Sequence, residues 1–155
     1  MNNPKQIFTQ EGYDKIVSEI EERETIVRTK IADEIEKARQ QGDLSENAAY
    51  KSAIESKEFN ENRINQLKEL LSNAEISTKS NSGVVDLGRR VTIQKSDGGA
   101  DVEYIIVGHN EADPTERKIS MDSPLGKSLS GKKKGDKVTV PTPGGSVDFV
   151  IKSIK

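Results

Sequence analysis

Apolar residues recur at steps of three and four along the first part of the chain. This spacing places them on one narrow stripe of an α-helix that begins near Gln10, with Thr9 as its N-cap. Gly42 is predicted to end this helix. The stripe consists of Tyr13, Ile16, Val17, Ile20, Val27, Ile31, Ile35 and Ala38.

A second helix is predicted to resume near Ser45, and its apolar positions follow one seven-residue register. Six of the eight register positions are apolar or aromatic, which is typical of a coiled-coil seam. Because only a few residues join the two helices, they must run antiparallel, as a hairpin about 40–45 Å long. The register consists of Tyr50, Ala53, Lys57, Asn60, Ile64, Leu67, Leu71 and Ala74.

The middle of both stripes is polar. These residues form either a hydrated layer that sets the register of the hairpin or a flexible point within it, and the pattern favours the layer. They are Arg23, Glu24, Lys30, Lys57 and Asn60.

The period changes after the second helix. Residues 72–83 are rich in Ser and Asn and predict the helix end and a linker. Short alternating runs then predict strands, and Ser123 and Pro124 open a predicted short helix. We therefore expect a two-domain α+β protein: a helical hairpin over 1–76, a linker over 77–84 and a mostly antiparallel β domain over 85–155. The strands are expected at 90–94, 102–107, 118–121, 137–140 and 147–151.

Composition and charge narrow the function classes. The 155 residues include no cysteine, which excludes disulfides and thiolate chemistry. Residues 1–80 carry 16 acidic and 12 basic side chains, and residues 81–155 carry 10 acidic and 12 basic ones, so neither half is a strongly basic nucleic-acid binder. No apolar run is long enough for a membrane span or a signal peptide, and we expect a soluble cytoplasmic protein.

Two acids stand at the predicted tip of the hairpin, in the stretch QQGDLSENAAY. Asp43 and Glu46 have the spacing of a capping box, with Asp43 as N-cap and Glu46 at the third helical position. Spacing alone favours this structural interpretation. The alternative is chemistry: one or two carboxylates, together with phosphate and water, are the usual ligands of Mg²⁺.

The tip sequence ARQQGDLSENAAY, the returning RINQLKELLSNAEI and the later MDSPLGKSLSGKKKGDKVTVPTPGG together resemble the bacterial GreA/GreB transcript-cleavage factors over nearly the whole chain. The hairpin lacks the excess of positive charge expected of the GreB branch, so the chain resembles the GreA branch more. The resemblance implies a coiled-coil N-terminal domain and an FKBP-like C-terminal domain. It also implies a factor, not itself an enzyme, that binds the rim of the RNA polymerase secondary channel. The hairpin would enter the channel and stimulate cleavage of the 3′ end of backtracked RNA.

The resemblance also assigns residues. Asp43 and Glu46 match the paired tip acids, which would share the Mg²⁺ of the polymerase active site, and no tightly bound cofactor is expected. The expected partners are the polymerase and the nascent RNA 3′ end, with no membrane, and the isolated protein is expected to be a monomer. Residues implied near the tip and RNA are Arg39, Leu44, Ser45, Asn47 and Tyr50; those implied at the polymerase rim are Asp122, Ser123 and Pro124.

The chain departs from the family pattern at two positions. Ala49 stands where Glu is common and Ile54 where a basic residue is common, which weakens the expected RNA contact. Two other functions compete with cleavage stimulation. One is a channel regulator that inhibits the polymerase without cleavage, and the paired acids argue against it. The other is a generic coiled-coil arm, for which an apolar or strongly basic tip would be expected.

Overall fold

The computed structural model describes residues 5–77 and 82–155, which form two compact units. One unit is Tyr13–Asn73; the other combines the N-terminal residues up to Gly12 with Ala74–Lys155. These units do not follow the predicted domain boundary at residue 76, because two short strands from the predicted hairpin domain group with the C-terminal residues. Residues 78–81, half of the predicted linker, lie outside the described part of the chain.

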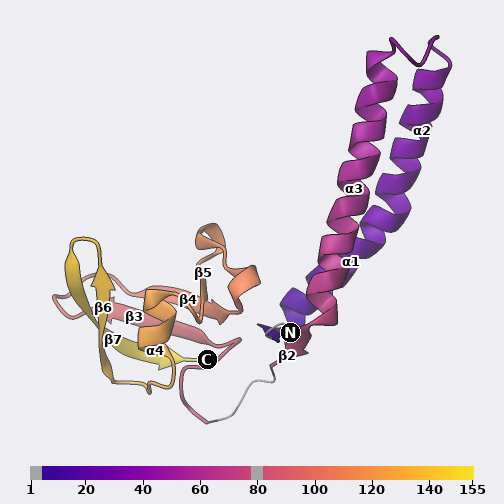
Figure 1. The fold of residues 1–155 in the computed structure, drawn as a ribbon. Helices are drawn as coiled ribbons and strands as arrows, with labels where there is room; N and C mark the ends of the chain where they lie inside the picture. The colour runs from indigo at the N-terminus through magenta and orange to yellow at the C-terminus, as the bar shows by residue number, and fades with distance from the viewer. Residues whose placement is uncertain (1–4, 78–81) are drawn as a thin grey trace. The chain divides into compact units, whose positions relative to one another are not determined.

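Unit Tyr13–Asn73 is the predicted helical hairpin (Figure 1). Thr9 caps the first helix as predicted, since its Oγ1 accepts a hydrogen bond of 3.0 Å from the backbone N–H of Gly12. Glu19 pairs with Arg63 at the base and Ala38 bonds to Asn47 at the tip, so the two arms run antiparallel. The helices are α1 (Gln10–Glu22), a π-helical segment η1 (Arg23–Val27), α2 (Arg28–Arg39) and α3 (Ala48–Ser72).

The seam of the hairpin follows the predicted register in part. Its buried apolar residues are Ile20, Ile31, Ala38, Ala53, Ile64 and Leu67. Asn60 is also buried, and it exchanges two hydrogen bonds of 3.2 Å with the guanidinium and carbonyl of Arg23. Arg23, the first residue of η1, and Asn60 therefore form a hydrogen-bonded polar pair across the seam, whereas Lys30 and Lys57 are exposed. Ala74 was predicted on the seam, but α3 ends at Ser72 and Ala74 belongs to a strand.

The C-terminal residues form a five-stranded sheet at the five predicted places, in the order β5-β4-β3-β7-β6. All neighbours are antiparallel except β4 and β5, so the α+β prediction with a mostly antiparallel sheet is confirmed, and the FKBP-like assignment stays a prediction. The strands are β3 (Arg90–Lys95), β4 (Val102–Val107), β5 (Lys118–Ser120), β6 (Lys137–Thr142) and β7 (Gly145–Ile154).

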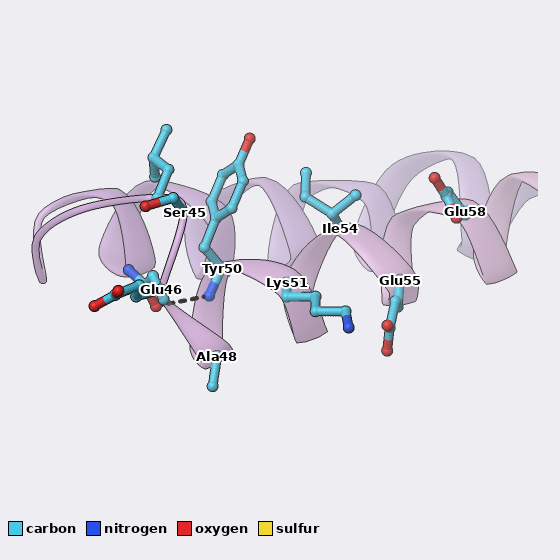
Figure 2. Close-up of a pocket in the computed structure, with 10 residues that line it drawn as sticks. Ser45, Glu46, Ala48, Tyr50, Lys51, Ile54, Glu55 and Glu58 are labelled. Atoms are coloured by element: carbon cyan, nitrogen blue, oxygen red, sulfur yellow. Dashed lines mark hydrogen bonds between the residues drawn. The ribbon is translucent and has the colours of Figure 1, made fainter.

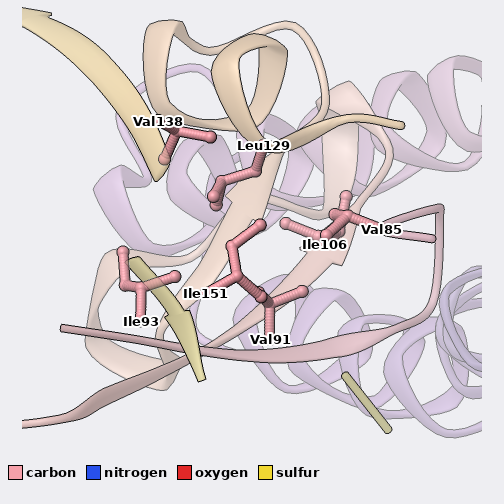
Figure 3. Packing of buried hydrophobic residues seen from close by; sticks show 7 residues of the cluster. All are labelled: Val85, Val91, Ile93, Ile106, Leu129, Val138 and Ile151. Atoms are coloured by element: carbon pink, nitrogen blue, oxygen red, sulfur yellow. The ribbon is translucent and has the colours of Figure 1, made fainter. Parts of the chain in front are cut away.

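Aliphatic side chains from the sheet, from the short helix α4 (Pro124–Leu129) and from the segment before β3 form one core (Figure 3). Its buried members are Val85, Val91, Ile93, Ile106, Leu129, Val138 and Ile151. Two more strands, β1 (Gln6–Phe8) and β2 (Ala74–Ile76), pair in parallel and were not predicted. Short 3₁₀ turns, η2 (His109–Glu111) and η3 (Pro114–Glu116), connect β4 to β5. No helix in the described residues is long and apolar enough to cross a membrane.

Candidate functional site at the hairpin tip

The candidate site is the eight-residue connection between α2 and α3. Helix α2 ends at Arg39, and Gln40 and Gln41 close its last turn through backbone hydrogen bonds to Glu36 and Ala38. Gly42 then takes φ +131°, a conformation that is essentially restricted to glycine. The chain reverses here as predicted, so the residues that follow lie at the end of the hairpin.

Asn47, and not Asp43, is the N-cap of α3. Its Oδ1 accepts a hydrogen bond of 3.0 Å from the backbone N–H of Tyr50 (Figure 2), while its Nδ2 donates one of 2.5 Å to the carbonyl of Ala38. One amide thus starts α3 and ties it to the end of α2. The predicted capping box is wrong: Glu46 precedes the cap and is not the third helical residue, which is Tyr50.

Asp43 instead stabilises the turn before the helix. Its Oδ1 accepts a hydrogen bond of 3.1 Å from the backbone N–H of Ser45. This bond, with a smaller contribution from the Ser45 side chain, holds the pKa of the Asp43 carboxyl below its ordinary value. Asp43 and Glu46 are both exposed, so each can present carboxylate oxygen to a ligand from solvent.

An open hollow of about 540 Å³ lies along α3 directly behind the tip. Tyr50, Ile54 and Glu58 are four residues apart, so they share one helix face, and Figure 2 shows Tyr50 and Ile54 on the same side of α3. Three carboxylates and one ammonium group lie around the hollow. Its lining residues are Leu44, Ser45, Glu46, Asn47, Ala48, Tyr50, Lys51, Ile54, Glu55 and Glu58.

The structure brings together most of the predicted tip residues. Leu44, Ser45, Glu46, Asn47 and Tyr50 all border the hollow. Arg39 is exposed at the end of α2, Ala49 is exposed on the first turn of α3, and neither lines the hollow.

Glu55 and Glu58 line the hollow but were not predicted as site residues. The signal that could have found Glu58 is its four-residue step from Ile54, which continues the face of Tyr50.

No group of three or more His, Cys, Asp or Glu side chains in the described residues is placed to hold a metal ion. Two exposed tip carboxylates are too few for a site of their own, but they suit an ion that also takes water and phosphate oxygens.

The second predicted site is the corner between β5 and α4. Ser123 caps α4 by accepting a hydrogen bond of 3.0 Å from Gly126 N–H, and it donates one of 2.7 Å to the carbonyl of Ser120. Pro124 occupies the first helical position, as predicted. Asp122 lies before the cap, with His109 Nδ1 at 4.0 Å from its Oδ2. The corner is therefore a rigid surface feature.

Two family models match nearly the whole sequence. Residues 6–76 match the family model "Transcription elongation factor, N-terminal", and residues 79–155 match "Transcription elongation factor, GreA/GreB, C-term". The chain is 46% identical to transcription elongation factor GreA of Bacillus cereus over 150 residues, 96% of this chain and 95% of that protein. It is 44% identical to GreA of Geobacillus kaustophilus over 158 residues, with both chains fully covered.

Among solved structures, the GreA factor homolog Gfh1 of Thermus thermophilus is similar at 26% identity and a TM-score of 0.43, covering 97% of this chain and 99% of that one. The sequence matches confirm the resemblance drawn from the motifs, including the likeness to GreA. Two family models together span nearly the full length, and relatives above 40% identity cover almost all of it. The chain therefore belongs to the GreA/GreB family of transcription elongation factors.

Proposed function

We propose that this protein binds RNA polymerase and stimulates the polymerase's own cleavage of the 3′ end of backtracked RNA in the bacterial cytoplasm. The observation that carries the proposal is the pair of exposed acids, Asp43 and Glu46, at the end of a stiff hairpin. Helix α3 alone has 25 residues, about 37 Å at ~1.5 Å per residue. Such an arm can deliver two carboxylates down the secondary channel to a distant active site, which is a positioning effect.

The acids are available for this role because Asn47 does the capping. Asp43 accepts the Ser45 N–H through Oδ1, and its contacts with Ser45 lower the pKa of the Asp43 carboxyl and so favour its charged form. Asp43 and Glu46 would together hold a Mg²⁺ ion shared with the polymerase and the RNA phosphate. Such an ion would stabilise negative charge on the phosphate oxygens. The chain supplies charge and position, so it is an accessory factor and not an enzyme by itself.

The residues around the hollow favour contact with an RNA base over contact with RNA phosphates. Glu46, Glu55 and Glu58 outnumber Lys51 there, and carboxylates repel a phosphate backbone. The half-buried Tyr50 offers an aromatic ring on which a base can stack. Arg39, on the other arm, is the exposed cation nearest in sequence to the tip and would meet a phosphate. Ile54, where a basic residue is common, adds apolar surface to the hollow instead.

Docking is assigned to the C-terminal sheet unit. The corner of Asp122, Ser123 and Pro124 is held rigid by its capping bonds, which favours a preformed contact with the rim of the secondary channel. The exposed run Lys132, Lys133 and Lys134 would add attraction to an acidic polymerase surface. We expect the free protein to be a monomer that meets the polymerase one to one.

The test is RNA release from stalled polymerase complexes with added protein. The wild type should release short 3′ fragments, and Asp43→Asn and Glu46→Gln should each abolish the stimulation. Asp43→Asn retains an Oδ1 acceptor for Ser45, so the turn should survive the loss of charge. Asp33→Asn, an exposed acid on α2, is the matched control and should act like the wild type.

Three outcomes would contradict the proposal. Full stimulation by both tip variants would mean that the acids do no chemistry. Slower elongation without released fragments would indicate a channel regulator that inhibits without cleavage. Failure of the protein to bind polymerase at all would leave the hairpin as an interaction arm for another partner.

A further inference from the structure

Glu111, in the turn η2, binds the start of helix α1 although the two are about a hundred positions apart in the chain. The backbone N–H of Thr9 donates a hydrogen bond of 2.9 Å to Glu111 Oε2, and the Thr9 hydroxyl donates a second one to Oε1. Thr9 Oγ1 in turn accepts the N–H of Gly12. The carboxylate thus orients the residue that caps α1, and its negative charge suits a helix N-terminus.

Two buried glycines make this contact possible. A Cβ on Gly108 would stand 2.1 Å from the backbone carbonyl oxygen of Ile7, so any side chain there would push β1 away. A Cβ on Gly12 would stand 1.8 Å from Glu111 Oε1. Gly108 N–H also donates to Glu111 Oε2 at 3.3 Å. We call Thr9, Gly12, Gly108 and Glu111 the clasp.

Further contacts join the same two segments. The Asn110 side chain donates a hydrogen bond of 2.6 Å to Gln6 Oε1, and the Lys118 ammonium lies 4.0 Å from Glu11. All of these residues belong to the unit that contains the C-terminal sheet, whereas α1 continues beyond Gly12 into the hairpin. The clasp therefore sits where the chain leaves the sheet unit for the arm that carries the tip.

We propose that Glu111 is a positioning residue for stimulated cleavage. Glu111 holds the first turn of α1 on the sheet unit, the unit assigned to bind the polymerase. In this way it would position the helix that leads to the tip acids. This inference rests on the function proposed above. A factor whose docking and catalytic groups lie in separate units needs a firm joint, because small misplacement of a catalytic group is costly in rate.

Three variants open the clasp by different means. Glu111→Ala removes the acceptor, and Thr9→Val removes the hydroxyl at similar volume. Gly108→Ala keeps the carboxylate but crowds the Ile7 carbonyl of β1 and Glu111 Oε2. Thr9→Ser keeps the hydroxyl and should behave as the wild type. Glu103→Gln is the matched control, since Glu103 is a surface acid of the same unit that pairs with Arg90 at 3.3 Å.

Two measurements are needed on the full chain. Amide hydrogen exchange at Thr9 and Gly12 reports the clasp directly and should become faster in the three opening variants. Cleavage in stalled complexes, measured against factor concentration, should show a maximal rate lower by about 10- to 100-fold with little change in the half-saturating concentration. A clasp that only stabilised the fold would instead lower the active fraction, which far-UV circular dichroism and the half-saturating concentration would reveal.

The outcomes separate this inference from the proposed function. If the wild type stimulates cleavage and the opening variants match its maximal rate despite faster exchange, Glu111 has no positioning role. Unchanged exchange in all three variants would equally overturn the clasp. If the wild type stimulates no cleavage, the proposed function fails, and the positioning role fails with it, while the exchange data still decide whether the clasp exists.

Discussion

Removing the Asn47 side chain should loosen the tip by breaking two contacts at once. Asn47 makes two separate hydrogen bonds, one that caps α3 and one that reaches across to α2. Loss of an N-cap costs about 1 kcal/mol, and a net hydrogen bond contributes about another 1 kcal/mol. The Ala38 carbonyl keeps a second donor, Gln41 N–H at 3.1 Å, so no penalty for an unpaired carbonyl is added. Asn47→Ala should therefore lower the free energy of unfolding by about 2 kcal/mol.

Two further substitutions separate the contribution of the cap from that of the hydrogen bond to Ala38. Asn47→Ser keeps a capping oxygen but is too short to reach Ala38, so it should cost about 1 kcal/mol. Asn47→Asp also keeps the cap but turns an acceptor toward the Ala38 carbonyl, so it should cost more than the serine variant. Asn62→Ala, an exposed position inside α3, is the control and should be neutral or slightly stabilising, because alanine favours helix.

The assay is urea unfolding followed by circular dichroism, together with amide exchange at Tyr50. The Tyr50 N–H donates to Asn47, so it should exchange faster in Asn47→Ala and stay protected in Asn47→Ser. Equal stability of Asn47→Ala and the wild type, with Tyr50 equally protected, would refute the assignment of Asn47 as the cap. Stimulated cleavage should also be slower with Asn47→Ala, because the two acids would then lie in a less ordered turn.

Three other changes probe the tip and the sheet. The pKa of the Asp43 carboxyl should lie below its ordinary value of about 3.9, since its charged form accepts Ser45 N–H. Its stabilisation of the turn is present above the unfolded-state pKa and is lost as pH falls through the folded-state pKa. NMR titration can follow this pH dependence, which Asp43→Asn should abolish because the amide does not titrate. Gly42→Ala should destabilise the tip by roughly 1–3 kcal/mol through backbone strain at φ +131°, whereas Gly144→Ala, with open space around it, should have little effect in the same urea assay. Leu129→Ala should cost about 2–5 kcal/mol because Leu129 is fully buried in the sheet core, and a smaller loss in urea unfolding would show that the core can collapse around the gap.

Periodicity was sufficient for the large elements. The stripe from Tyr13 to Ala38 and the register through Leu67 located the hairpin, because a long amphipathic helix repeats its signal many times. The five sheet strands were equally visible, since each alternates and ends at a turn. Strands β1 and β2 have three residues each, too few for any period to show, and they form only because distant segments pair.

The cap could not be assigned from spacing because the tip holds two good candidates. Asp43 and Asn47 both belong to residue types that cap helices, and Asp43 even has an acid three positions later. The choice depends on a contact across the hairpin, between Asn47 and the Ala38 carbonyl, which becomes possible only once the two arms are paired. The clasp was missed for the same reason, since nothing near Glu111 in the sequence indicates Thr9 as its partner.

Because Asn47 and not Asp43 is the N-cap of α3, the two tip acids need a different explanation. In a capping box, the carboxylates of Asp43 and Glu46 would accept hydrogen bonds from backbone amides, and this capping role would explain why both acids are present. In the structure, the neutral side chain of Asn47 caps α3, Glu46 precedes the helix, and Asp43 contacts only Ser45 within the turn. Two exposed carboxylates therefore lie at the end of the hairpin, and neither caps a helix. A role in helix capping therefore no longer explains why both acids are present, which favours the hypothesis that the polymerase uses their charge.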